Sequence, residues 1–526
     1  MDDNVIRPDF GTRPPPDADF PLTGFALLHS RAKIGIEAPA VTIEVLLSGG
    51  LPSFSIVGMA ETAVRESKDR VRGAIISCGF KFPQRRIAVS LGPADLRKTG
   101  GRFDLAIALG ILAAGRKIKA GALASFEFYG ELGMNGDIRP VPGILPAALK
   151  AAGAGRCIVV PLANRIEAAL SETTVYGAGM LLEVLGHLTG FAPLEPDARL
   201  VPSAAATAAA TTMAPDLAEV RGQTLARRAL EIAAAGSHNM LLSGPPGTGK
   251  SMLARRLPGI LPPLTEAEAL QTAAVDSVLG RPLDVTRWRQ RPFRAPHHTA
   301  SAGALVGGGT DPRPGEVSRA HNGVLFLDEL PEFSRHVLEV LREPLETGSI
   351  TISRAAGQAD FPARFQLIAA MNPCPCGYLG DPRGDCNCSA ERVRNYRAKI
   401  SGPLLDRIDI QVCVQPLAPE ALRPGLPAAE TSATVLQRVT AARRLQYERA
   451  GLCNAHLDGA LLESTCALTG AGWELLEKAM NRFALSARAH QRVRRVARTI
   501  ADLAGEKAIA LEHLGEALAL RQFDRG

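Results

Sequence analysis

A glycine-rich loop between a short apolar run and a helical segment offers the clearest chemistry in this sequence. Residues 244–251 read GPPGTGKS and fit the pattern G-x-x-x-x-G-K-[ST]. Glycines let backbone N–H groups close around phosphate oxygens, and the following helix directs its positive end at them. Lys250 would reach the β- and γ-phosphates, and the Ser251 hydroxyl would ligate Mg²⁺. The predicted phosphate-binding residues are Gly244, Pro245, Pro246, Gly247, Thr248, Gly249, Lys250 and Ser251. The alternative is a chance glycine loop before a helix, which the flanking strand and helix disfavour.

Two acids follow a second apolar run further along the chain, in GVLFLDELPEF. Asp328 would hold the Mg²⁺ through water, and Glu329 would polarise the attacking water as a general base. An apolar strand that ends in Asp-Glu is common by itself, but after a phosphate-binding loop it becomes specific. The two motifs together predict ATP and Mg²⁺ as cofactors.

Four of the nine cysteines fall in one short stretch, MNPCPCGYLGDPRGDCNCS. Cys374, Cys376, Cys386 and Cys388 form two CxC units, and four thiolates could complete a tetrahedral Zn²⁺ site. Such a site would be structural, because four thiolates leave no open coordination position. Reduced thiols and a redox role remain as alternatives.

Composition limits the class of protein. A chain of 526 residues is too long for one hydrophobic core, so several folding units are expected. No apolar run is long enough to cross a bilayer, and the acidic, proline-rich start does not resemble a signal peptide. We therefore expect a soluble cytoplasmic protein with no membrane partner. The net charge of +7 permits a polyanionic partner without requiring one.

The order of patterns predicts the domains. Residues 1–20 read as a disordered tail, 21–195 as an α/β domain, and 196–215 as a linker rich in Ala, Thr and Pro. Strand and helix patterns alternate over 216–415, which predicts a parallel sheet flanked by helices with the cysteine loop 374–388 inserted. The pattern over 425–523 is helical, and it predicts a small α-domain.

The motifs also carry a resemblance. GPPGTGKS together with LFLDE resembles the AAA+ superfamily. Further phrases are similar to the magnesium-chelatase-like YifB/ComM family: DLAEVRGQTLARRALEIAAAGSHNMLLSGPPGTGKSMLA, RPFRAPHHTASAGALVGGG, PGEVSRAHNGVLFLDELPEF, MNPCPCGY and VARTIADL. The likeness runs over nearly the whole chain. It implies a AAA+ ATPase core followed by a helical lid.

The resemblance assigns further residues. Asn372 matches sensor 1, the polar residue that helps to orient the attacking water. Arg407 in GPLLDRIDI matches the arginine finger, which reaches the γ-phosphate held by a neighbouring subunit. Arg488 in ALSARAHQRV matches sensor 2 of the lid. A finger that acts on a neighbour requires a ring, so the resemblance implies a homo-hexamer.

The segment ETGSITISRAAGQADFPARF predicts a β-hairpin with a turn at Gly357. In related AAA+ proteins a hairpin at this place faces the central pore, where Arg354 and Arg364 could touch a polyanion. An ordinary surface hairpin is the alternative. His297 and His298 look like a ligand pair, but neighbouring residues of a strand point to opposite faces, so we expect an insert loop there.

The first domain resembles the Lon-protease type without its Ser–Lys dyad. Arg102 and Phe103 occupy the expected serine region, Leu145 stands about where the lysine should be, and residues 99–112 contain no serine. We therefore expect no peptidase activity. Such a domain beside an ATPase also resembles RadA-type branch-migration proteins, in which it serves as a scaffold for assembly and DNA binding. Arg97, Lys98 and Arg102 are candidate DNA contacts, with a solvated charged surface as the alternative.

The resemblance therefore favours a DNA motor. Proteins of the ComM type are helicases that promote branch migration during natural transformation, so the implied partners are single-stranded and branched DNA. A chelatase-type ATP-dependent protein remodeller is the main alternative, and an ATP-dependent protease is a weaker one. Basic residues at 488, 492 and 495 of the lid are consistent with contact to a polyanion or with a solvated face.

Overall fold

The computed structural model divides into two compact units, residues 1–200 and 201–526. It describes residues 24–58, 64, 66–201, 215–309, 311–354, 357–382, 384–417, 429–483 and 486–521. The predicted tail over 1–20 and the larger part of the predicted linker, 202–214, lie outside the described residues. The first residues assigned to the linker belong to the first unit, because the backbone of Asp197 donates a hydrogen bond to the Val175 carbonyl.

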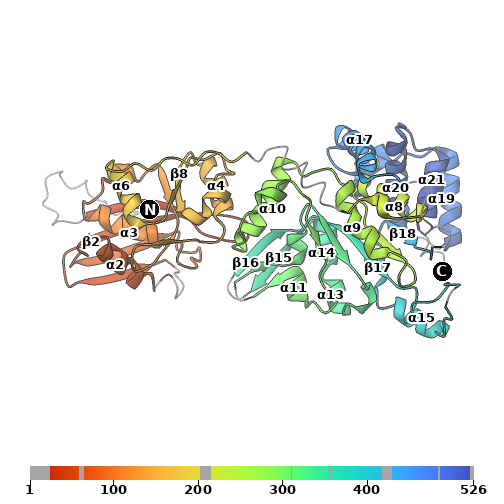
Figure 1. Ribbon diagram of the computed structural model, residues 1–526, viewed down its shortest axis with the longest axis horizontal. Coiled ribbons are helices and arrows are strands. Elements are labelled where there is room, and N and C mark those ends of the chain that lie inside the picture. Colours follow the sequence, from red (N-terminus) through yellow and green to blue (C-terminus); the bar gives the residue numbers. More distant parts are fainter. Residues whose placement is uncertain are drawn as a thin grey trace, which may run out of the picture. The chain divides into compact units, whose positions relative to one another are not determined.

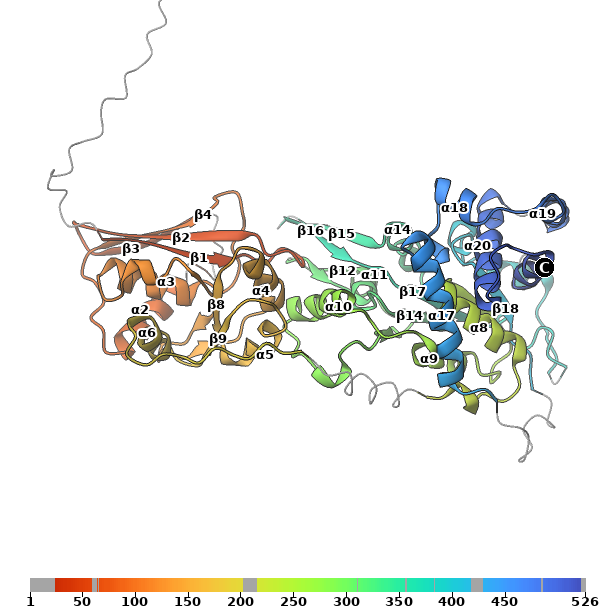
Figure 2. The ribbon, with the colours of Figure 1, turned by 90° about the horizontal axis from the view of Figure 1, so that it is seen from above.

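A mixed sheet forms the centre of the first unit (Figures 1 and 2). Within the described part of this unit its strands are, in order across the sheet, β3 (Ser53–Val57), β4 (Arg86–Gly92), β2 (Ala40–Ser48), β1 (Gly24–Arg31), β5 (Phe126–Phe128), β8 (Cys157–Pro161) and β9 (Val175–Ala178). β2 runs antiparallel to both of its neighbours, whereas β3 and the strands from β5 onward pair in parallel. Val45 of β2 and Val89 of β4 are paired and buried.

The helices of this unit are α2 (Ser67–Ser77), α3 (Asp104–Ala114), α4 (Ile144–Gly153), α5 (Arg165–Ala168) and α6 (Leu181–Thr189), and a small hairpin joins β6 (Glu131–Leu132) to β7 (Ile138–Arg139). Every residue of α3 is buried, as its apolar sequence predicts. A Cβ on Gly110 would lie 2.6 Å from Val45 Cγ2, so glycine lets α3 approach β2 closely. Asp104 pairs with Arg70 of α2 at 2.7 Å. α2, α3 and α6 share one core along one face of the sheet (Figure 2).

A parallel sheet forms the centre of the second unit, as the alternating patterns predict. Its strands among the described residues are, in order, β11 (Phe293–Arg294), β14 (Val324–Leu327), β17 (Gln366–Met371), β10 (Met240–Ser243) and β18 (Ile410–Cys413). All neighbouring pairs are parallel. β10 and β14 are buried at every position, which is why they read as apolar runs rather than as alternating strands.

Helices of very different lengths surround this sheet. They are α8 (Thr224–Gly236), α9 (Lys250–Ile260), α10 (Glu266–Val278), α11 (Ala302–Val306), α12 (Glu316–Arg319), α13 (Arg335–Glu339), α14 (Arg342–Thr347), α15 (Ala390–Arg397), α16 (Gly402–Leu405), α17 (Ser432–Ala450), α18 (Gly459–Thr465), α19 (Gly470–Phe483), α20 (Ala487–Ala504) and α21 (Leu511–Ala519). Two hairpins complete the unit: β12 (Gly307–Gly308) with β13 (Arg313–Pro314), and β15 (Ser349–Arg354) with β16 (Gly357–Pro362). The second confirms the hairpin predicted before Asn372.

The C-terminal helices belong to the same compact unit as the sheet. Leu230 of α8, Val439 of α17 and Val493 of α20 share one hydrophobic core. α17, α19, α20 and α21 gather at one side of the unit, beside α8 and β18 (Figure 1). The residues predicted as a helical domain form helices that pack directly on the α/β core of this unit.

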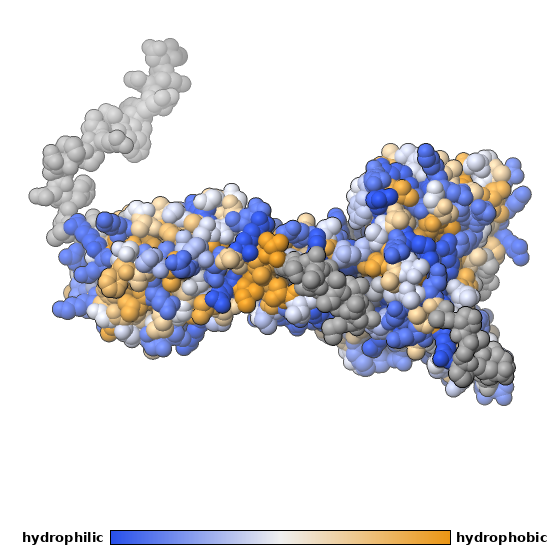
Figure 3. Space-filling view, turned by 45° about the horizontal axis from the view of Figure 1, so that its top comes forward, coloured by the Kyte–Doolittle hydropathy of each residue, from blue (hydrophilic) through white to orange (hydrophobic). Residues whose placement is uncertain are grey.

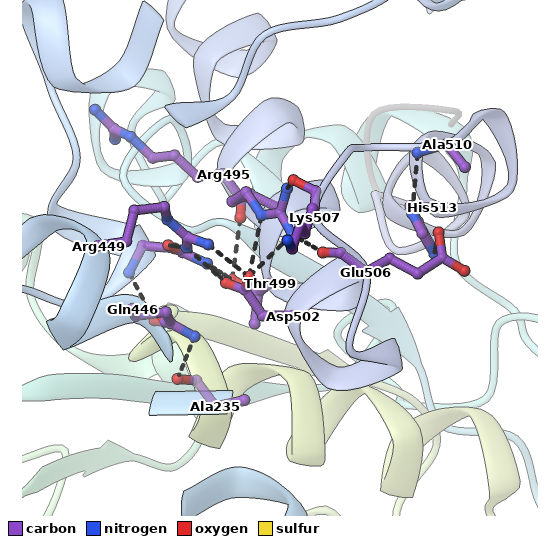
Figure 4. A network of polar contacts seen from close by, with 12 residues as sticks. Ala235, Gln446, Arg449, Arg495, Thr499, Asp502, Glu506, Lys507, Ala510 and His513 are labelled. Atoms are coloured by element: carbon purple, nitrogen blue, oxygen red, sulfur yellow. Dashed lines mark hydrogen bonds and ion pairs between the residues drawn. The ribbon is translucent and has the colours of Figure 1, made fainter. Parts of the chain in front are cut away.

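A buried polar network ties these helices together (Figure 4). Asp502 of α20 accepts hydrogen bonds from Arg449 of α17 at 2.8 Å and from Asn454 at 2.7 Å. Arg498 lies 2.9 Å from the same carboxylate. Gln446 donates to the carbonyl of Ala235 at the end of α8. Because the low-dielectric interior strengthens such contacts and makes their loss costly, the network specifies how the helices pack.

The surface mixes residue types. Hydrophilic residues spread over the whole face in Figure 3, with hydrophobic residues in smaller patches between them. Among the helices of the described segments, none combines the length and the apolar character needed to cross a membrane.

The network predicts a large effect of Asp502→Asn on stability. The Asp502 side chain is 1% exposed and pairs with two arginines, so neutralising it leaves the buried Arg498 and the partly buried Arg449 without this counter-charge. We expect the free energy of unfolding of the second unit to fall by about 3 kcal/mol or more. Both tryptophans of the chain, Trp288 and Trp473, lie in this unit, so tryptophan fluorescence during urea denaturation reports on it.

Glu448→Gln is the matched control. Glu448 also pairs with an arginine of α17, Arg444, but its side chain is 63% exposed. Its loss should change the free energy of unfolding by less than about 0.5 kcal/mol. Equal shifts of the urea midpoint in the two variants would contradict the role assigned to the network.

Candidate nucleotide-binding site

Three parallel strands deliver the predicted catalytic residues to one edge of the sheet. The loop 244–251 follows β10 directly, Asp328 and Glu329 follow β14, and Asn372 follows β17. β17 lies between the other two, and the carboxyl ends of parallel strands meet at the same edge. Residues that are far apart in the sequence therefore converge there.

Glycines shape the loop that carries Lys250. A Cβ on Gly244 would lie 2.2 Å from the Val414 carbonyl oxygen, which leaves room only for glycine. Gly247 and Gly249 have φ values of 74° and 90°, a region that favours glycine, and a Cβ on either would meet nothing within 4 Å. The loop therefore has open space on its outer side, and α9 begins immediately after it. This arrangement fits the phosphates of a nucleotide.

The Lys250 ammonium is buried and held by its own loop. Its Nζ donates to the carbonyl oxygens of Gly244 and Pro245 at 2.6 and 2.8 Å, and to Oδ1 of Asn372 at 3.2 Å. Burial lowers the pKa of Lys250 to about 8, against the opposing charge of Asp328. A poorly solvated cation that has only neutral hydrogen-bond partners suits a phosphate anion.

The hydroxyl of Ser251 and the carboxylate of Asp328 form an oxygen donor set. Ser251 Oγ lies 2.6 Å from Asp328 Oδ2, although the two residues are distant in the sequence. A hydroxyl and a carboxylate suit Mg²⁺, which prefers oxygen ligands and keeps several waters. The chemistry of these donors therefore fits the Mg²⁺ of an ATP complex.

Glu329 projects from a constrained turn beside this donor set. Its φ is 53°, in the left-handed region that few residues other than glycine adopt. Its carboxylate Oε2 lies 3.1 Å from Nδ1 of His298, which comes from the loop after β11. The sequence placed His298 in an insert loop and gave it no role, and no spacing within the chain indicates this contact.

Gln223 is a second residue that sequence reasoning did not assign. It lies just before α8, and its amide donates to the carbonyl oxygens of Thr248 and Gln415 at 3.3 and 2.7 Å. It thus links the phosphate-binding loop to the segment that follows β18. In the sequence, the one indication of a role for Gln223 is that it lies in the stretch DLAEVRGQTLARRAL, which resembles the family.

Arg407 lies at the opposite edge of the sheet. It precedes β18, and its carbonyl accepts a hydrogen bond from Asn239, the residue before β10. β10 has four residues, so roughly 13 Å of strand separates this edge from the loop of the same subunit. The guanidinium is 4% exposed and pairs with Glu346. Burial lowers the pKa of Arg407, while Glu346 opposes the shift and the nearby charge of Arg488 adds to it.

Arg488 is exposed in the first turn of α20, and its charge lies near enough to Arg407 to lower the pKa of that guanidinium. Ser486, two residues earlier, lies 3.4 Å from the carboxylate of Asp406. The structure therefore places Arg407, with Arg488 near it, at one edge of the sheet and the other predicted site residues at the opposite edge.

Asp409 anchors α20 to that amino edge. Burial alone would raise the pKa of Asp409, but the charge of Arg492 at 2.5 Å and the nearby His238 lower it well below its ordinary value. His238 also contacts Thr499 of α20 at 2.8 Å. Arg492 is thus occupied within the subunit, so the basic residues of this helix do not form one free face.

The four clustered cysteines meet, as the sequence predicts for a metal site. Their Sγ atoms all lie within 4.8 Å of one another, and Cys374 is 3.3 Å from Cys376 and 3.7 Å from Cys386. Zn–S bonds of about 2.3 Å in a tetrahedron require S–S edges of about 3.8 Å. The donors therefore fit zinc. A Cβ on Gly377, within this loop, would lie 2.9 Å from the ring of Pro246, so the loop packs on the phosphate-binding loop.

The predicted DNA-contact residues have different surroundings. Arg354 is exposed at the turn end of β15, whereas Arg364 is exposed two residues after β16, at the other end of the hairpin. In the first unit Lys98 is 0% exposed and donates to the Pro93 carbonyl, and Arg102 is 4% exposed against the ring of Tyr129. Burial withdraws Lys98 and Arg102 from the surface, so any contact to DNA from this segment rests on Arg97.

Comparisons with known proteins agree along the chain. Family models match three successive parts: "Subunit ChlI of Mg-chelatase" over residues 43–164, "Magnesium chelatase, subunit ChlI" over 216–422, and "Magnesium chelatase, subunit ChlI C-terminal" over 429–521. A magnesium-chelatase 38 kDa subunit of Cereibacter sphaeroides is 28% identical over 174 residues, which are 29% of this chain and 51% of that protein.

Two similar proteins match almost end to end. The competence protein ComM of Haemophilus influenzae is 49% identical over 501 residues, covering 95% of this chain and 98% of that protein. YifB of Salmonella typhimurium is 47% identical over 503 residues, covering 95% and 97%. With a phosphate-binding loop, an acidic pair and a polar residue converging on one edge of a parallel sheet, this protein belongs to the YifB/ComM family of magnesium-chelatase-like AAA+ ATPases.

Proposed function

We propose that this protein is an ATP-driven DNA motor that acts as a ring of six identical subunits and moves branch points in recombining DNA. The observation that carries the proposal is the convergence of Lys250, Asp328, Glu329 and Asn372 at one sheet edge, in a chain similar over 95% of its length to a protein named for competence. The family implies ATP hydrolysis, and the DNA substrate is the part that needs testing.

Each residue of the site has a separable task. Backbone N–H groups of the loop and the Lys250 ammonium bind the phosphates, and Ser251 and Asp328 hold the Mg²⁺, which neutralises developing charge when bound. Glu329 accepts a proton from the attacking water, and Asn372 helps to orient that water. Lys250 contacts Asn372 at 3.2 Å, so the loop and the predicted sensor are joined directly.

The two arginines complete the site of a neighbouring subunit. Because Arg407 and Arg488 lie at the amino edge of the sheet, they serve a nucleotide held by the next subunit rather than by their own. This arrangement supports a closed ring, since each subunit then both holds a nucleotide and completes another site. Arg407 must leave Glu346 to act, and the 52% exposure of the Glu346 side chain leaves this pair open to exchange.

DNA contact is assigned to the β15–β16 hairpin. Arg354 is exposed at its turn end, and six paired residues per strand, roughly 20 Å of chain, carry it outward from the core. Contacts from such arginines to DNA phosphates are independent of base sequence and weaken with salt. A motor that moves along DNA of any sequence requires this kind of contact.

A chelatase-type remodeller is the second candidate, because the family models carry that name. Proteolysis has less support. Arg102 and Leu145 occupy the regions where a Ser–Lys dyad would stand, and both are buried. Stimulation of ATP hydrolysis by DNA separates the motor from both.

The proposed DNA substrate is tested by measuring the rate of ATP hydrolysis with and without single-stranded and branched DNA. We expect DNA to raise the rate, and Lys250→Ala to abolish hydrolysis because it removes the ammonium that binds the phosphates. Arg354→Ala should weaken the stimulation, with a lower dependence on salt, because one phosphate contact is lost.

Arg444→Ala controls for the loss of one positive charge. Arg444 is exposed on α17 and pairs only weakly with Glu448, at 3.6 Å. Its substitution should leave the stimulation by DNA unchanged. Hydrolysis that no form of DNA alters, together with no retention on DNA at low salt, would overturn the proposed substrate.

We further propose that the cysteine cluster binds one structural zinc ion. The purified protein should contain about one zinc per chain by elemental analysis, because four thiolates complete the coordination sphere. Cys386→Ser should lose the metal and slow ATP hydrolysis, since the loop that follows Asn372 packs on Pro246. Cys78→Ser, in the first unit, is the control and should keep both. Full activity without any bound metal would refute this assignment.

A further inference from the structure

The imidazole of His298 faces the carboxylate of the proposed general base. Nδ1 of His298 lies 3.1 Å from Oε2 of Glu329. The two residues come from neighbouring strands of the sheet: His298 follows β11, Glu329 follows β14, and the strands pair in parallel. The contact therefore joins two loops at the same catalytic edge.

Glu329 needs such a partner. Its side chain is 55% exposed, and its backbone adopts a left-handed conformation with φ 53°. An exposed glutamate without a partner samples several rotamers, whereas a general base must hold its oxygen close to the attacking water. A misplacement of about 1 Å can cost about a hundredfold in rate.

We propose that His298 is the positioning residue of Glu329, holding its carboxylate at the catalytic edge for proton transfer from water. In this proposal His298 acts on the reaction through its contact with Glu329 and has no chemical step of its own. The inference rests on the proposed hydrolysis of ATP at this site and does not depend on the DNA substrate.

His298 is itself held in place. The ring of His297 lies against it with centroids 4.1 Å apart, and Phe333 meets it edge to face at 6.4 Å. Its side chain is 32% exposed, less than that of Glu329. The loop ends at Ser301, whose Oγ accepts a hydrogen bond from the Ala304 amide and caps α11. A partly buried ring that packs against two other rings, on a capped loop, can restrain an exposed carboxylate.

His297 provides an internal control. It is adjacent in sequence and also an imidazole, but its Nδ1 contacts Thr299 Oγ1 at 2.9 Å instead of the catalytic acid, and it is exposed. A change there disturbs the loop without removing the contact to Glu329.

The test compares His298→Leu, His298→Asn and His297→Leu in the full chain. Leucine keeps the volume but removes the nitrogen. Asparagine keeps a nitrogen the same number of bonds from the backbone as Nδ1, so it can still meet the carboxylate. The rate at saturating ATP, the KM and the affinity for a fluorescent ATP analogue are measured for each variant.

We expect His298→Leu to lower kcat about ten- to a hundredfold while the affinity for the nucleotide stays within about twofold of wild type. His298→Asn should recover a large part of the lost rate. His297→Leu removes the ring beside His298 but keeps the nitrogen that faces Glu329, so it should lower the rate far less than His298→Leu does. Loss of folding alone would weaken nucleotide affinity as well, so the split between kcat and affinity identifies positioning.

Two results would overturn the inference. One is a wild-type kcat in His298→Leu, and the other is an asparagine variant as impaired as the leucine variant. Failure of the proposed function gives a different result. If DNA does not change the rate of ATP hydrolysis by the wild type, the proposed DNA substrate is wrong, yet the three variants still differ as expected.

Discussion

The common direction of the strands in the second unit is the constraint on which its proposed chemistry depends. Because β10, β14 and β17 are parallel neighbours, the residues that follow them converge, and this convergence brings Lys250 to Asn372 and Ser251 to Asp328. Because β18 runs in the same direction as these strands, the residues that precede it lie at the opposite edge of the sheet. In the proposed ring, a subunit would hold a nucleotide with one edge and present its arginines from the other, so a second subunit would bring the two together.

The C-terminal helices make the amino edge rigid. Asp409 holds Arg492 of α20, His238 contacts Thr499 of the same helix, and Asp502 ties α20 to α17. These groups are buried, so their pairing is maintained at the cost of desolvation and tolerates little displacement. Arg488, one turn before Arg492, is consequently carried on a helix fixed to the strand edge that also carries Arg407. A nucleotide bound by a neighbouring subunit would therefore act on α20 and this strand edge together.

The sequence patterns predicted the secondary-structure elements and the motifs more fully than they predicted the surroundings of individual charged side chains. The strands β10 and β14 follow from apolar runs, the β15–β16 hairpin follows from its sequence pattern, and the loop 244–251 follows from its fixed spacing. The burial of Lys98 and Arg102 did not follow, because a basic run looks the same whether its side chains point outward or fold into a core. The contact between His298 and Glu329 depends on the pairing of β11 with β14, which no local pattern encodes. The gathering of Arg407 with Arg488 likewise depends on how α20 packs.

In the proposed ring, each nucleotide site is completed by the neighbouring subunit. This arrangement is tested by mixing Lys250→Ala with Arg407→Ala, because the first variant cannot bind phosphates and the second cannot complete a neighbour's site. Each variant alone should hydrolyse ATP very slowly. In the mixture, an Arg407→Ala subunit keeps an intact loop and meets an intact arginine from a Lys250→Ala neighbour, so we predict that the rate recovers. A mixture no more active than its components would contradict the account.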